Sequence, residues 1–215
     1  SSGASSITVK GGSFYKYNPA ESYTEPNGPV SYVSDGYTVM QNGDWYTVVP
    51  ATSGTVTDAL ENAEDGDTVN HGADVKLEKN ITISSDIPIN GNGATLSGAP
   101  VYIAPDAAVT VKNVTFTAPV NTGNNASSLY ASNHTGDIVI ENCTFVDFQW
   151  EAVQITPLAG SNITIRNCYF ENTKTMSETG IKTNRYVHVE VTDNATDINQ
   201  INVTLENNTF KNIRN

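Results

Sequence analysis

The sequence has little charge, few cysteines and no long apolar run. Charged residues make up 16% of its 215 residues, and two residues are cysteines, Cys143 and Cys168. Two cysteines are too few for a disulfide scaffold, and without a run of about 18 apolar residues no membrane insertion is predicted. The formal net charge of −12 disfavours nucleic acid and anionic membrane surfaces as partners.

The polar surface is supplied instead by Asn, Thr, Ser and Gly. Thr favours strands, while Asn and Gly favour turns, so the composition fits an all-β chain. Hydrophobic residues, at 38%, suffice for a core, and the length allows one sizeable domain with a small appendage. Because the chain starts with Ser and shows no signal peptide, we expect a piece of a longer protein.

Four segments repeat one pattern: apolar, polar, apolar, charged, Asn, x, x, Phe. Successive copies are offset by 29, 25 and 40 residues, about the length of one rung of a parallel β-helix with insertions at its turns. We therefore predict a right-handed parallel β-helix, a solenoid of stacked rungs. The longest offset contains a strand-like run, 186–191, which we expect to project as a hairpin or loop. The four copies are 109–116, 138–145, 163–170 and 203–210.

Stacking would place equivalent residues in columns about 4.8 Å apart. The apolar positions would face inward, and the Phe positions predict an aromatic stack. Cys143 and Cys168 share a column, where stacked free thiols are favoured over a disulfide because parallel side chains give poor disulfide geometry. Two further columns are an outward one of alternating charge (Lys112, Glu141, Arg166, Glu206) and a predicted ladder of buried amides (Asn113, Asn142, Asn167, Asn207).

Two parts of the chain differ in pattern. Residues 51–215 form the predicted β-helix domain, with a short capping helix near 56–64 whose N-cap lies near Thr55 or Thr57. Residues 1–50 form a separate N-terminal segment. It begins with a rung-like strand at 7–14, continues as a loop, and ends in a β-hairpin whose turn is Gln-Asn-Gly-Asp at 41–44.

Here a family resemblance appears. The run 57–69 (TDALENAEDGDTV), followed by Ile-Thr-Ile at 81–83 and NGNGATL at 90–96, resembles the opening of β-helix proteins of the pectate-lyase-like superfamily. The resemblance covers about residues 55–215 and implies the fold; that superfamily includes polysaccharide lyases, hydrolases, adhesins and phage tail proteins. The N-terminal segment is similar to uncharacterised surface or phage-related proteins of gut bacteria.

Candidate catalytic residues are dispersed. The resemblance implies acids gathered around Ca²⁺ beside an Arg or Lys base, yet the acids show no Asp-x-Asp or Asp-Asp grouping and the three His show no ligand spacing. We therefore predict no catalytic residue, no metal site and no cofactor. The acids considered are Asp147, Glu151, Glu171 and Glu178, with Lys182, Arg166 and Arg185 as basic neighbours.

A sugar-binding face is the alternative. The runs 128–131, 152–155 and 180–183 align as the second strand of successive rungs and place Tyr130, Gln154 and Lys182 in one outward column. A sugar ring stacks on an aromatic side chain while amides and charges bond its hydroxyls. The predicted ligand-binding residues are Tyr130, Trp150, Glu151, Gln154, Glu178 and Lys182.

Three functions stay open. The first is a non-enzymatic extracellular or virion-associated β-helix, a rigid structural or adhesive module that recognises a surface glycan or a protein. The second is a polysaccharide lyase or glycoside hydrolase whose acids converge only in three dimensions. The third is a phage fibre or capsid decoration protein. Because the last rung and the first strand leave apolar surface and backbone groups uncovered, we expect a homo-oligomer, such as a trimer, or a place in a longer chain.

Overall fold

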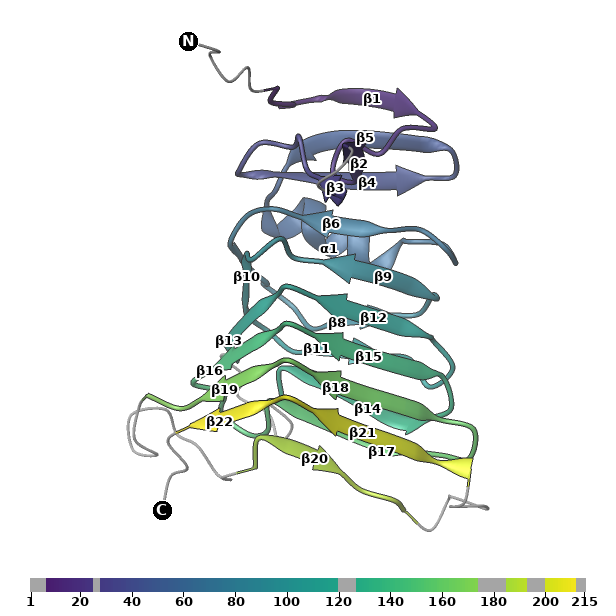
Figure 1. The fold of residues 1–215 in the computed structure, drawn as a ribbon, viewed down its shortest axis with the longest axis vertical. Coiled ribbons are helices and arrows are strands. Elements are labelled where there is room, and N and C mark those ends of the chain that lie inside the picture. The colour runs from purple at the N-terminus through teal and green to yellow at the C-terminus, as the bar shows by residue number, and fades with distance from the viewer. Residues whose placement is uncertain (1–6, 25–27, 120–126, 174–184, 193–199, 212–215) are drawn as a thin grey trace.

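The chain winds through three β-sheets in turn, and each circuit forms a rung stacked on the one before (Figure 1). The computed structural model describes residues 7–24, 28–119, 127–173, 185–192 and 200–211. Within these residues the rungs run from β6 to β22, and neighbouring rungs pair as parallel strands. The prediction of a parallel β-helix is confirmed.

The nine-stranded sheet, called the long sheet, contains the first strand of every rung. Neighbouring strands pair one-to-one without a register shift, so equivalent residues lie beside one another. The predicted columns of the repeat therefore exist. The rung strands of this sheet are β6 (Val69–His71), β9 (Ile87–Asn90), β12 (Val109–Lys112), β15 (Asp137–Glu141), β18 (Asn162–Arg166) and β21 (Asn202–Glu206).

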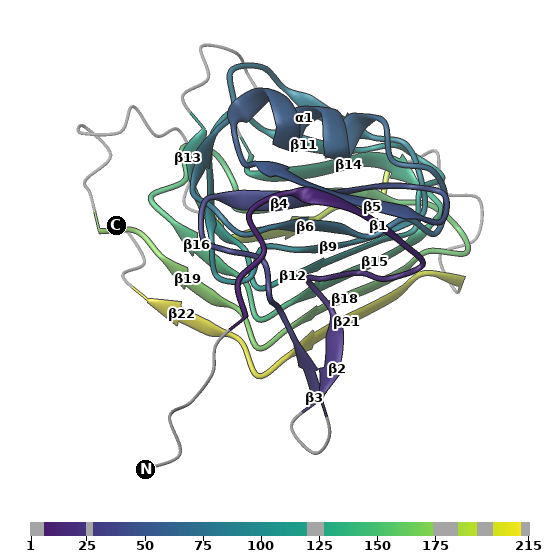
Figure 2. The ribbon, with the colours of Figure 1, turned by 90° about the horizontal axis from the view of Figure 1, so that it is seen from above.

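Two shorter sheets complete each rung. The six-stranded sheet holds β7 (Val75–Lys76), β10 (Thr95–Gly98), β13 (Thr115–Pro119), β16 (Thr144–Val146), β19 (Tyr169–Glu171) and β22 (Thr209–Lys211). The five-stranded sheet holds β8 (Ile81–Ile83), β11 (Val101–Ile103), β14 (Leu129–His134), β17 (Val153–Pro157) and β20 (Val187–Val189). Seen from above, the three sheets surround one interior (Figure 2).

The core is a continuous apolar column along the stack. Alternate residues of each strand point inward, so Ile138 and Ile140 are fully buried while Val139 between them is not. The predicted aromatic stack is present: the rings of Phe116, Phe145, Phe170 and Phe210 lie nearly parallel, with centroids 4.9–5.0 Å apart. Dispersion and burial of these rings join four successive rungs.

The Asn at the end of each long-sheet strand has a different role from the one predicted. Asn142 and Asn167 are exposed, and among the described residues no hydrogen bond joins the side-chain amides of the four repeat Asn. All four have a positive φ of 52–55°, the left-handed conformation. Asn tolerates this conformation better than other non-glycine residues, so the repeat keeps Asn to make the bend into the six-stranded sheet. The predicted buried amide ladder at this position was wrong.

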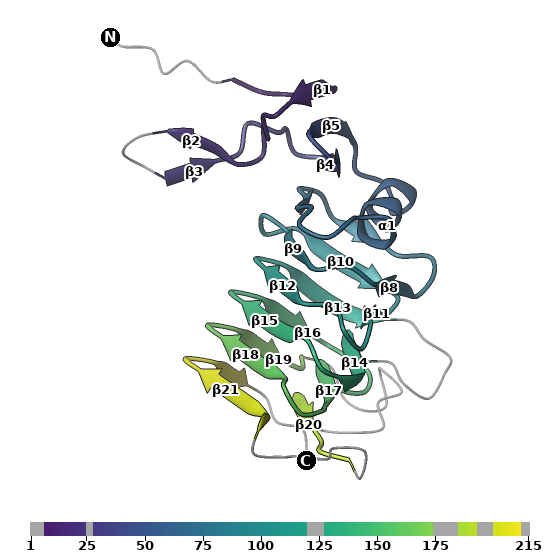
Figure 3. The same ribbon diagram turned by 90° about the vertical axis from the view of Figure 1, so that its right-hand side faces the viewer.

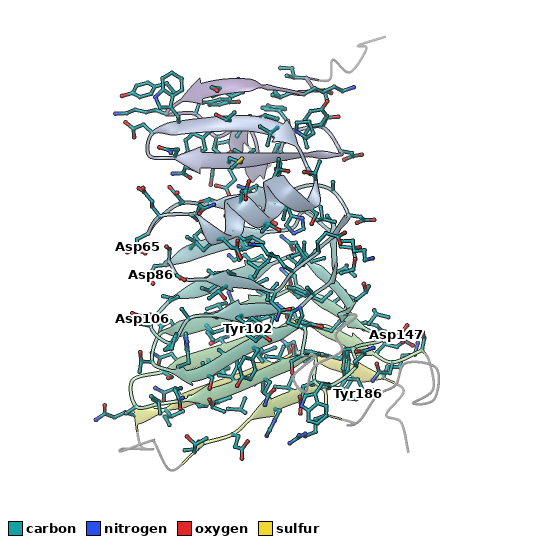
Figure 4. The ribbon with its side chains drawn as sticks, turned by 180° about the vertical axis from the view of Figure 1, so that it is seen from behind. Asp65, Asp86, Tyr102, Asp106, Asp147 and Tyr186 are labelled. Carbon is teal, nitrogen blue, oxygen red and sulfur yellow. The ribbon has the colours of Figure 1, made fainter. Side chains whose placement is uncertain are left out.

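A side-chain ladder lies instead where the long-sheet strands begin. Asn202 Nδ2 donates to Asn162 Oδ1 at 2.9 Å, and Asn162 Nδ2 donates to Asp137 Oδ1 at 2.7 Å. Farther up the stack, Asp65 and Asp86 each accept a backbone N–H from the following rung, at 2.9 and 2.7 Å. Figure 4 shows Asp65, Asp86 and Asp106 in line along this edge. Side-chain oxygens at this edge therefore tie β6 to β9 and β12, and β15 to β18 and β21.

The outward column of alternating charge is confirmed. The Glu141 carboxylate lies 3.1 Å from Arg166 Nε and 3.5 Å from Lys112 Nζ, on the rungs below and above. The hydrogen bond from Arg166, with the charges of Arg166 and Lys112, holds the pKa of Glu141 below its usual value. A slip by one rung would place like charges side by side, so the column favours the observed register.

The two cysteines are buried free thiols, as predicted. Cys143 and Cys168 lie two residues after Glu141 and Arg166, one rung apart, and point into the core. The hydrogen bond with Cys168, together with burial, raises the pKa of the Cys143 thiol, and the same hydrogen bond lowers the pKa of the Cys168 thiol. Both therefore act as small core side chains.

The N-terminal end of the stack is covered by helix α1 (Ser53–Glu61) (Figure 2). Val56, Ala59 and Leu60 on one face of the helix are buried in the core. The helix starts earlier than predicted, because Thr52 is the N-cap: its hydroxyl accepts the Thr55 N–H, and Thr55 Oγ1 accepts the Thr52 N–H in return. The predicted capping role is confirmed, and the predicted cap residue was wrong.

The N-terminal segment extends the long sheet with antiparallel strands. The predicted hairpin is present as β4 (Tyr37–Asn42) and β5 (Trp45–Pro50), and β4 pairs antiparallel with β6. The strand expected to be a rung, β1 (Gly12–Tyr15), pairs antiparallel with β5 and so is no rung. A second hairpin, β2 (Ser22–Thr24) and β3 (Gly28–Val30), projects to one side (Figure 3).

The corners of the rungs differ in their tolerance of length. Two residues separate the long-sheet strand from the six-stranded sheet in four rungs, whereas four residues separate β9 from β10. At that longer corner a Cβ on Gly91 would lie 2.7 Å from the Asn113 carbonyl oxygen, so the position requires glycine. The corner from the six-stranded to the five-stranded sheet has 4, 2, 9, 6 and 15 residues in successive rungs, and the corner that returns to the long sheet has 3, 5, 2, 4 and 12. The corner at the Asn bend is therefore the most constant in length, and the longest insertion lies at the corner before the five-stranded sheet.

The left-handed bend can be tested at Asn167. We expect Asn167→Ala to lower the free energy of unfolding by about 1 kcal/mol, because a Cβ without a local hydrogen-bonding group disfavours a positive φ. Asn167→Gly is the matched control and should unfold near the wild-type urea midpoint. Equal midpoints for the Ala variant and the wild type would contradict this role for the bend.

The aromatic stack can be tested by comparing its middle with its last ring. Phe145 is fully buried between two rings, whereas Phe210 is 43% exposed with Phe170 as its stacked neighbour. We expect Phe145→Ala to cost about 3–5 kcal/mol in urea unfolding, because it leaves a cavity between rungs. Phe210→Ala should cost less than half as much. Similar losses would show that the stack does not depend on burial.

Candidate functional site

The outer face of the five-stranded sheet carries one polar and aromatic column. Its members alternate with the buried residues Val101, Ile103, Leu129 and Ala131, so they point outward. The strand register places each beside its equivalent on the next rung, which confirms the predicted pairing of Tyr130 with Gln154. This outer column consists of Thr82, Tyr102, Tyr130, Gln154 and His188.

The lowest member of the column differs from the prediction. His188 stands beside Gln154, in the place expected for Lys182. The run 186–191, expected to project as an insertion, supplies the rung strand β20. Val187 and Val189 alternate with His188 as a rung strand requires, which explains why this run supplies the strand. Lys182 and Glu178 lie outside the described residues.

Two tyrosines form the upper part of the column. The rings of Tyr102 and Tyr130 are half-buried and meet edge to face, with centroids 5.5 Å apart and an interplanar angle of 89°. Asn80 Nδ2 lies 3.4 Å from the Tyr102 hydroxyl. Burial, with the neighbouring Tyr130, raises the pKa of Tyr102, so its hydroxyl stays a neutral hydrogen-bonding group. The pair offers ring surface with hydroxyls beside it.

Glu151 is fully buried, not exposed as predicted. Its Oε1 lies 2.8 Å from Arg185 Nη2, and its Oε2 accepts the Ser127 hydroxyl at 3.1 Å. Ser127 Oγ also lies 3.2 Å from Gln154 Oε1. The carboxylate therefore lies beneath the column and is linked through Ser127 to Gln154.

Arg185 and His188 connect this buried carboxylate to the surface. Arg185 Nη1 lies 3.1 Å from His188 Nε2, and His188 Nδ1 lies 3.5 Å from Glu151 Oε1. Because Arg is always a donor, His188 Nε2 is the acceptor in this contact. Glu190 Oε2, 3.4 Å from Nε2, is the second acid beside the ring. Arg185 and His188 are thereby held against Glu151.

Burial raises the pKa of the Glu151 carboxyl, against the opposing effects of Arg185, the Ser127 hydrogen bond and His188. The positive charge of Arg185 offsets the negative charge of the Glu151 carboxylate. Trp150, predicted as a ligand-binding residue, is half-buried in the bend before β17. It lies next to Glu151 in the chain.

Several residues of this face escaped the sequence analysis. Tyr102 is the middle residue of Val-Tyr-Ile, which matches Leu-Tyr-Ala at 129–131, so alignment of the second strand in the earlier rungs would have found it. Ser127 and Arg185 carry no local signal, whereas His188 lies in the alternating run 186–191 that was assigned to an insertion. Their position depends on corners of unequal length, which a repeat alignment does not resolve.

The remaining candidate acids have structural partners. Asp147 accepts the Thr173 N–H at 2.6 Å, and Glu171 accepts the Tyr169 hydroxyl at 2.7 Å and pairs with Lys211 at 3.2 Å. Figure 4 shows Asp147 at a corner remote from the edge of Asp65 and Asp86. Across the part of the chain that the structure describes, no three His, Cys, Asp or Glu residues are grouped to hold a metal ion.

The architecture defines a class, that of β-helix solenoids with a capped N-terminal end. A family model described as a right handed beta helix region matches residues 97–215, and the chain belongs to that family. The comparisons with curated proteins and with solved structures found no match. Among the described residues, no helix is both long and apolar enough to cross a membrane.

The buried Glu151 predicts a pH dependence. Because its pKa is raised, the folded protein keeps this proton at pH values where the unfolded chain has lost it, so its ionisation weakens the fold as pH rises above the ordinary value of 4.5. Glu151→Gln cannot ionise. We expect its free energy of unfolding, relative to the wild type, to rise with pH above 4.5.

Glu171→Gln is the control with the opposite sign. The Tyr169 hydrogen bond and Lys211 lower the pKa of Glu171, so its ionisation stabilises the fold and is lost as pH falls through the range below 4.5. This variant should therefore lose stability relative to the wild type as pH rises. Urea unfolding at several pH values measures both. If both variants follow the same trend, Arg185 rather than burial governs Glu151.

Proposed function

We propose that this β-helix is a non-enzymatic, rigid adhesive module that binds a neutral glycan along its outer column. The observation that carries the proposal is the run of Tyr102, Tyr130, Gln154 and His188 on four successive rungs. Aromatic rings provide apolar faces for sugar rings, and hydroxyl, amide and imidazole groups bond sugar hydroxyls. Because these groups lie in a line along the stack, an extended chain fits better than a single sugar.

The charges favour a neutral ligand. The Arg185 guanidinium is engaged by Glu151, and Glu190 is near His188, so the column presents no free cation among its described members. The chain as a whole carries a net charge of −12. An acidic polysaccharide would meet repulsion at this face, at low salt above all.

The rigidity follows from the core. A continuous apolar interior with stacked Phe rings resists bending between rungs, which suits a spacer or an adhesive stalk. An extracellular, cell-surface or virion location, including a phage fibre, fits such a role and belongs to this proposal. Self-association, as a trimer for example, does so too.

An enzymatic role is the second candidate. A buried carboxyl of raised pKa beside Arg185 and His188 is the kind of environment that active sites use. A polysaccharide lyase or hydrolase would shorten its ligand, whereas an adhesive module would leave the chain length unchanged. Incubation with each polysaccharide, followed by size analysis, separates the two functions.

The column is tested by affinity electrophoresis through gels that contain neutral or acidic polysaccharides. We expect retention by a neutral polysaccharide, and a loss of about threefold to tenfold in affinity for Tyr130→Ala or Tyr102→Ala, the worth of one aromatic contact. Tyr23→Ala is the matched control, because Tyr23 is 79% exposed on the β2–β3 hairpin.

Three results would contradict the proposal: no retention by any polysaccharide, equal losses for Tyr23→Ala and Tyr130→Ala, or stronger retention by acidic gels. The melting temperature of each variant should be measured in parallel, so that a loss of binding is not confused with a loss of fold.

A further inference from the structure

A cavity of about 320 Å³ lies at the capped end of the stack, between helix α1 and the N-terminal hairpin. Helix α1 contacts β4 here, and Figure 3 shows the hairpin just beyond the helix. Asp58 and Asn62 line the cavity from the helix, and Met40 and Thr47 line it from the hairpin. Asp67, in the turn before β6, completes the polar part of the lining. The outer column uses none of these residues.

Asp67 supplies the buried carboxylate of this cavity, since the residue is only 5% exposed. Its Oδ2 accepts the Glu64 N–H at 3.0 Å. Its Oδ1 accepts no hydrogen bond among the described residues, yet it is not enclosed and stays accessible to solvent. The turn needs one side-chain oxygen, which an Asn would supply equally well. The negative charge and the second oxygen therefore remain available to a donor from outside the chain.

The position of this carboxylate is fixed from two sides. The Asp67 N–H donates to the Glu64 carbonyl at 3.0 Å, which closes the turn. The next residue is tied to the hairpin, because the Thr68 N–H donates to Gln41 Oε1 at 3.0 Å. A group held in this way is preorganised, so a ligand that meets it loses little free energy to ordering the site.

The charge of the cavity is unbalanced. Its lining holds two carboxylates, and no cationic side chain is among the lining residues that the structure describes. Two cations at this end of the molecule are already paired: Lys16 Nζ lies 3.3 Å from Asp44, and Lys79 Nζ lies 2.6 Å from Glu61. The cavity therefore attracts a ligand with positive charge.

An exposed aromatic pair borders the cavity. Asn42 lines the cavity and pairs with Trp45, which pairs in turn with Tyr15 across the next strand. Residues that pair directly across antiparallel strands share a face, so the two rings lie on the same sheet face as Met40 and Thr47. The rings of Tyr15 and Trp45 are 57% and 50% exposed, with centroids 5.2 Å apart. They offer an apolar surface beside a negatively charged recess.

We propose that this cavity binds the primary ammonium group of an organic ligand, whose carbon skeleton lies on the aromatic pair of Tyr15 and Trp45. An ammonium group has three N–H donors and no acceptor, which matches the free Asp67 oxygen, the Asp58 carboxylate and the Thr47 hydroxyl. Aromatic rings favour the apolar carbons of such a ligand, and their faces attract its charge.

Size restricts the ligand. At about 30 Å³ per water, the volume equals roughly ten or eleven waters, enough for a lysine side chain or an amino sugar. These are the two chemical sources of the ammonium group that the experiment must separate. A bare Ca²⁺ ion fits less well, because it takes about six to eight oxygen ligands and the lining offers two carboxylates.

The test is saturation-transfer NMR on the full chain at about pH 6, where both amines are protonated. The probes are Nα-acetyl-L-lysine methylamide and D-glucosamine. Their N-acetylated forms, Nα,Nε-diacetyl-L-lysine methylamide and N-acetyl-D-glucosamine, are controls of similar size without the charge. We expect at least one amine to bind saturably, and its acetylated form to bind at least about tenfold more weakly. Binding by one amine alone would support the inference and identify the source.

Three variants locate the binding. Asp67→Asn keeps an oxygen for the turn and removes the charge, so it should weaken amine binding at least about tenfold with little change in melting temperature. Asp58→Asn, on the exposed side of the helix, and Trp45→Ala should each weaken it about threefold. Asp35→Asn is the matched control, because it removes the same charge from an exposed position outside the cavity and should change nothing.

The inference would be overturned if neither amine bound, or if the acetylated forms bound as tightly. Equal losses for Asp35→Asn and Asp67→Asn would also overturn it, as would Ca²⁺ binding in the cavity more tightly than either amine. If Asp67→Asn lowers the melting temperature, Asp58→Asn and Trp45→Ala decide, and unchanged binding in both counts against the site. Tyr130→Ala should leave amine binding intact, so the result is independent of the outer column.

Discussion

The structure depends on the in-register parallel pairing of one rung with the next. A single rung cannot bury its inward side chains, because its interior is only as deep as one strand spacing. The pairing of β12, β15, β18 and β21 without a shift turns the Ile, Val and Phe positions into continuous buried columns. It also turns the outward positions into columns, so the same constraint creates both the core and the outer column.

The sequence predicted the parts of the fold that repeat. The apolar positions, the Phe stack and the alternating charges of Lys112, Glu141 and Arg166 all follow from copies of equal length aligned without gaps. The capping helix was predictable because its apolar face precedes the first rung, although the N-cap was expected near Thr55 or Thr57 and lies at Thr52. The corrections to the N-cap residue and to the role of the repeat Asn each have a local cause.

What the sequence left unresolved is the part that does not repeat. The role of Asn142 and Asn167 is a backbone conformation, which a column of identical residues cannot distinguish from a side-chain ladder. The ligand-binding residues stay a prediction, in which Tyr130 and Gln154 share a column, Glu151 is buried, and Lys182 lies outside the described residues. Two strand-like runs competed for the last position of the five-stranded sheet, and alternation around His188 decided it.

The unequal corners have a consequence for how such a protein changes over time. The corner made by the Asn bend keeps two residues in four rungs, while the next corner varies from 2 to 15, directly before the strands of the five-stranded sheet. Ser127, Glu151 and Arg185 all come from that variable corner. A lineage can therefore lengthen or replace these segments, and so alter what the neighbouring face selects, while the inherited scaffold stays intact. For an engineer, the same corner is the natural place to insert foreign loops.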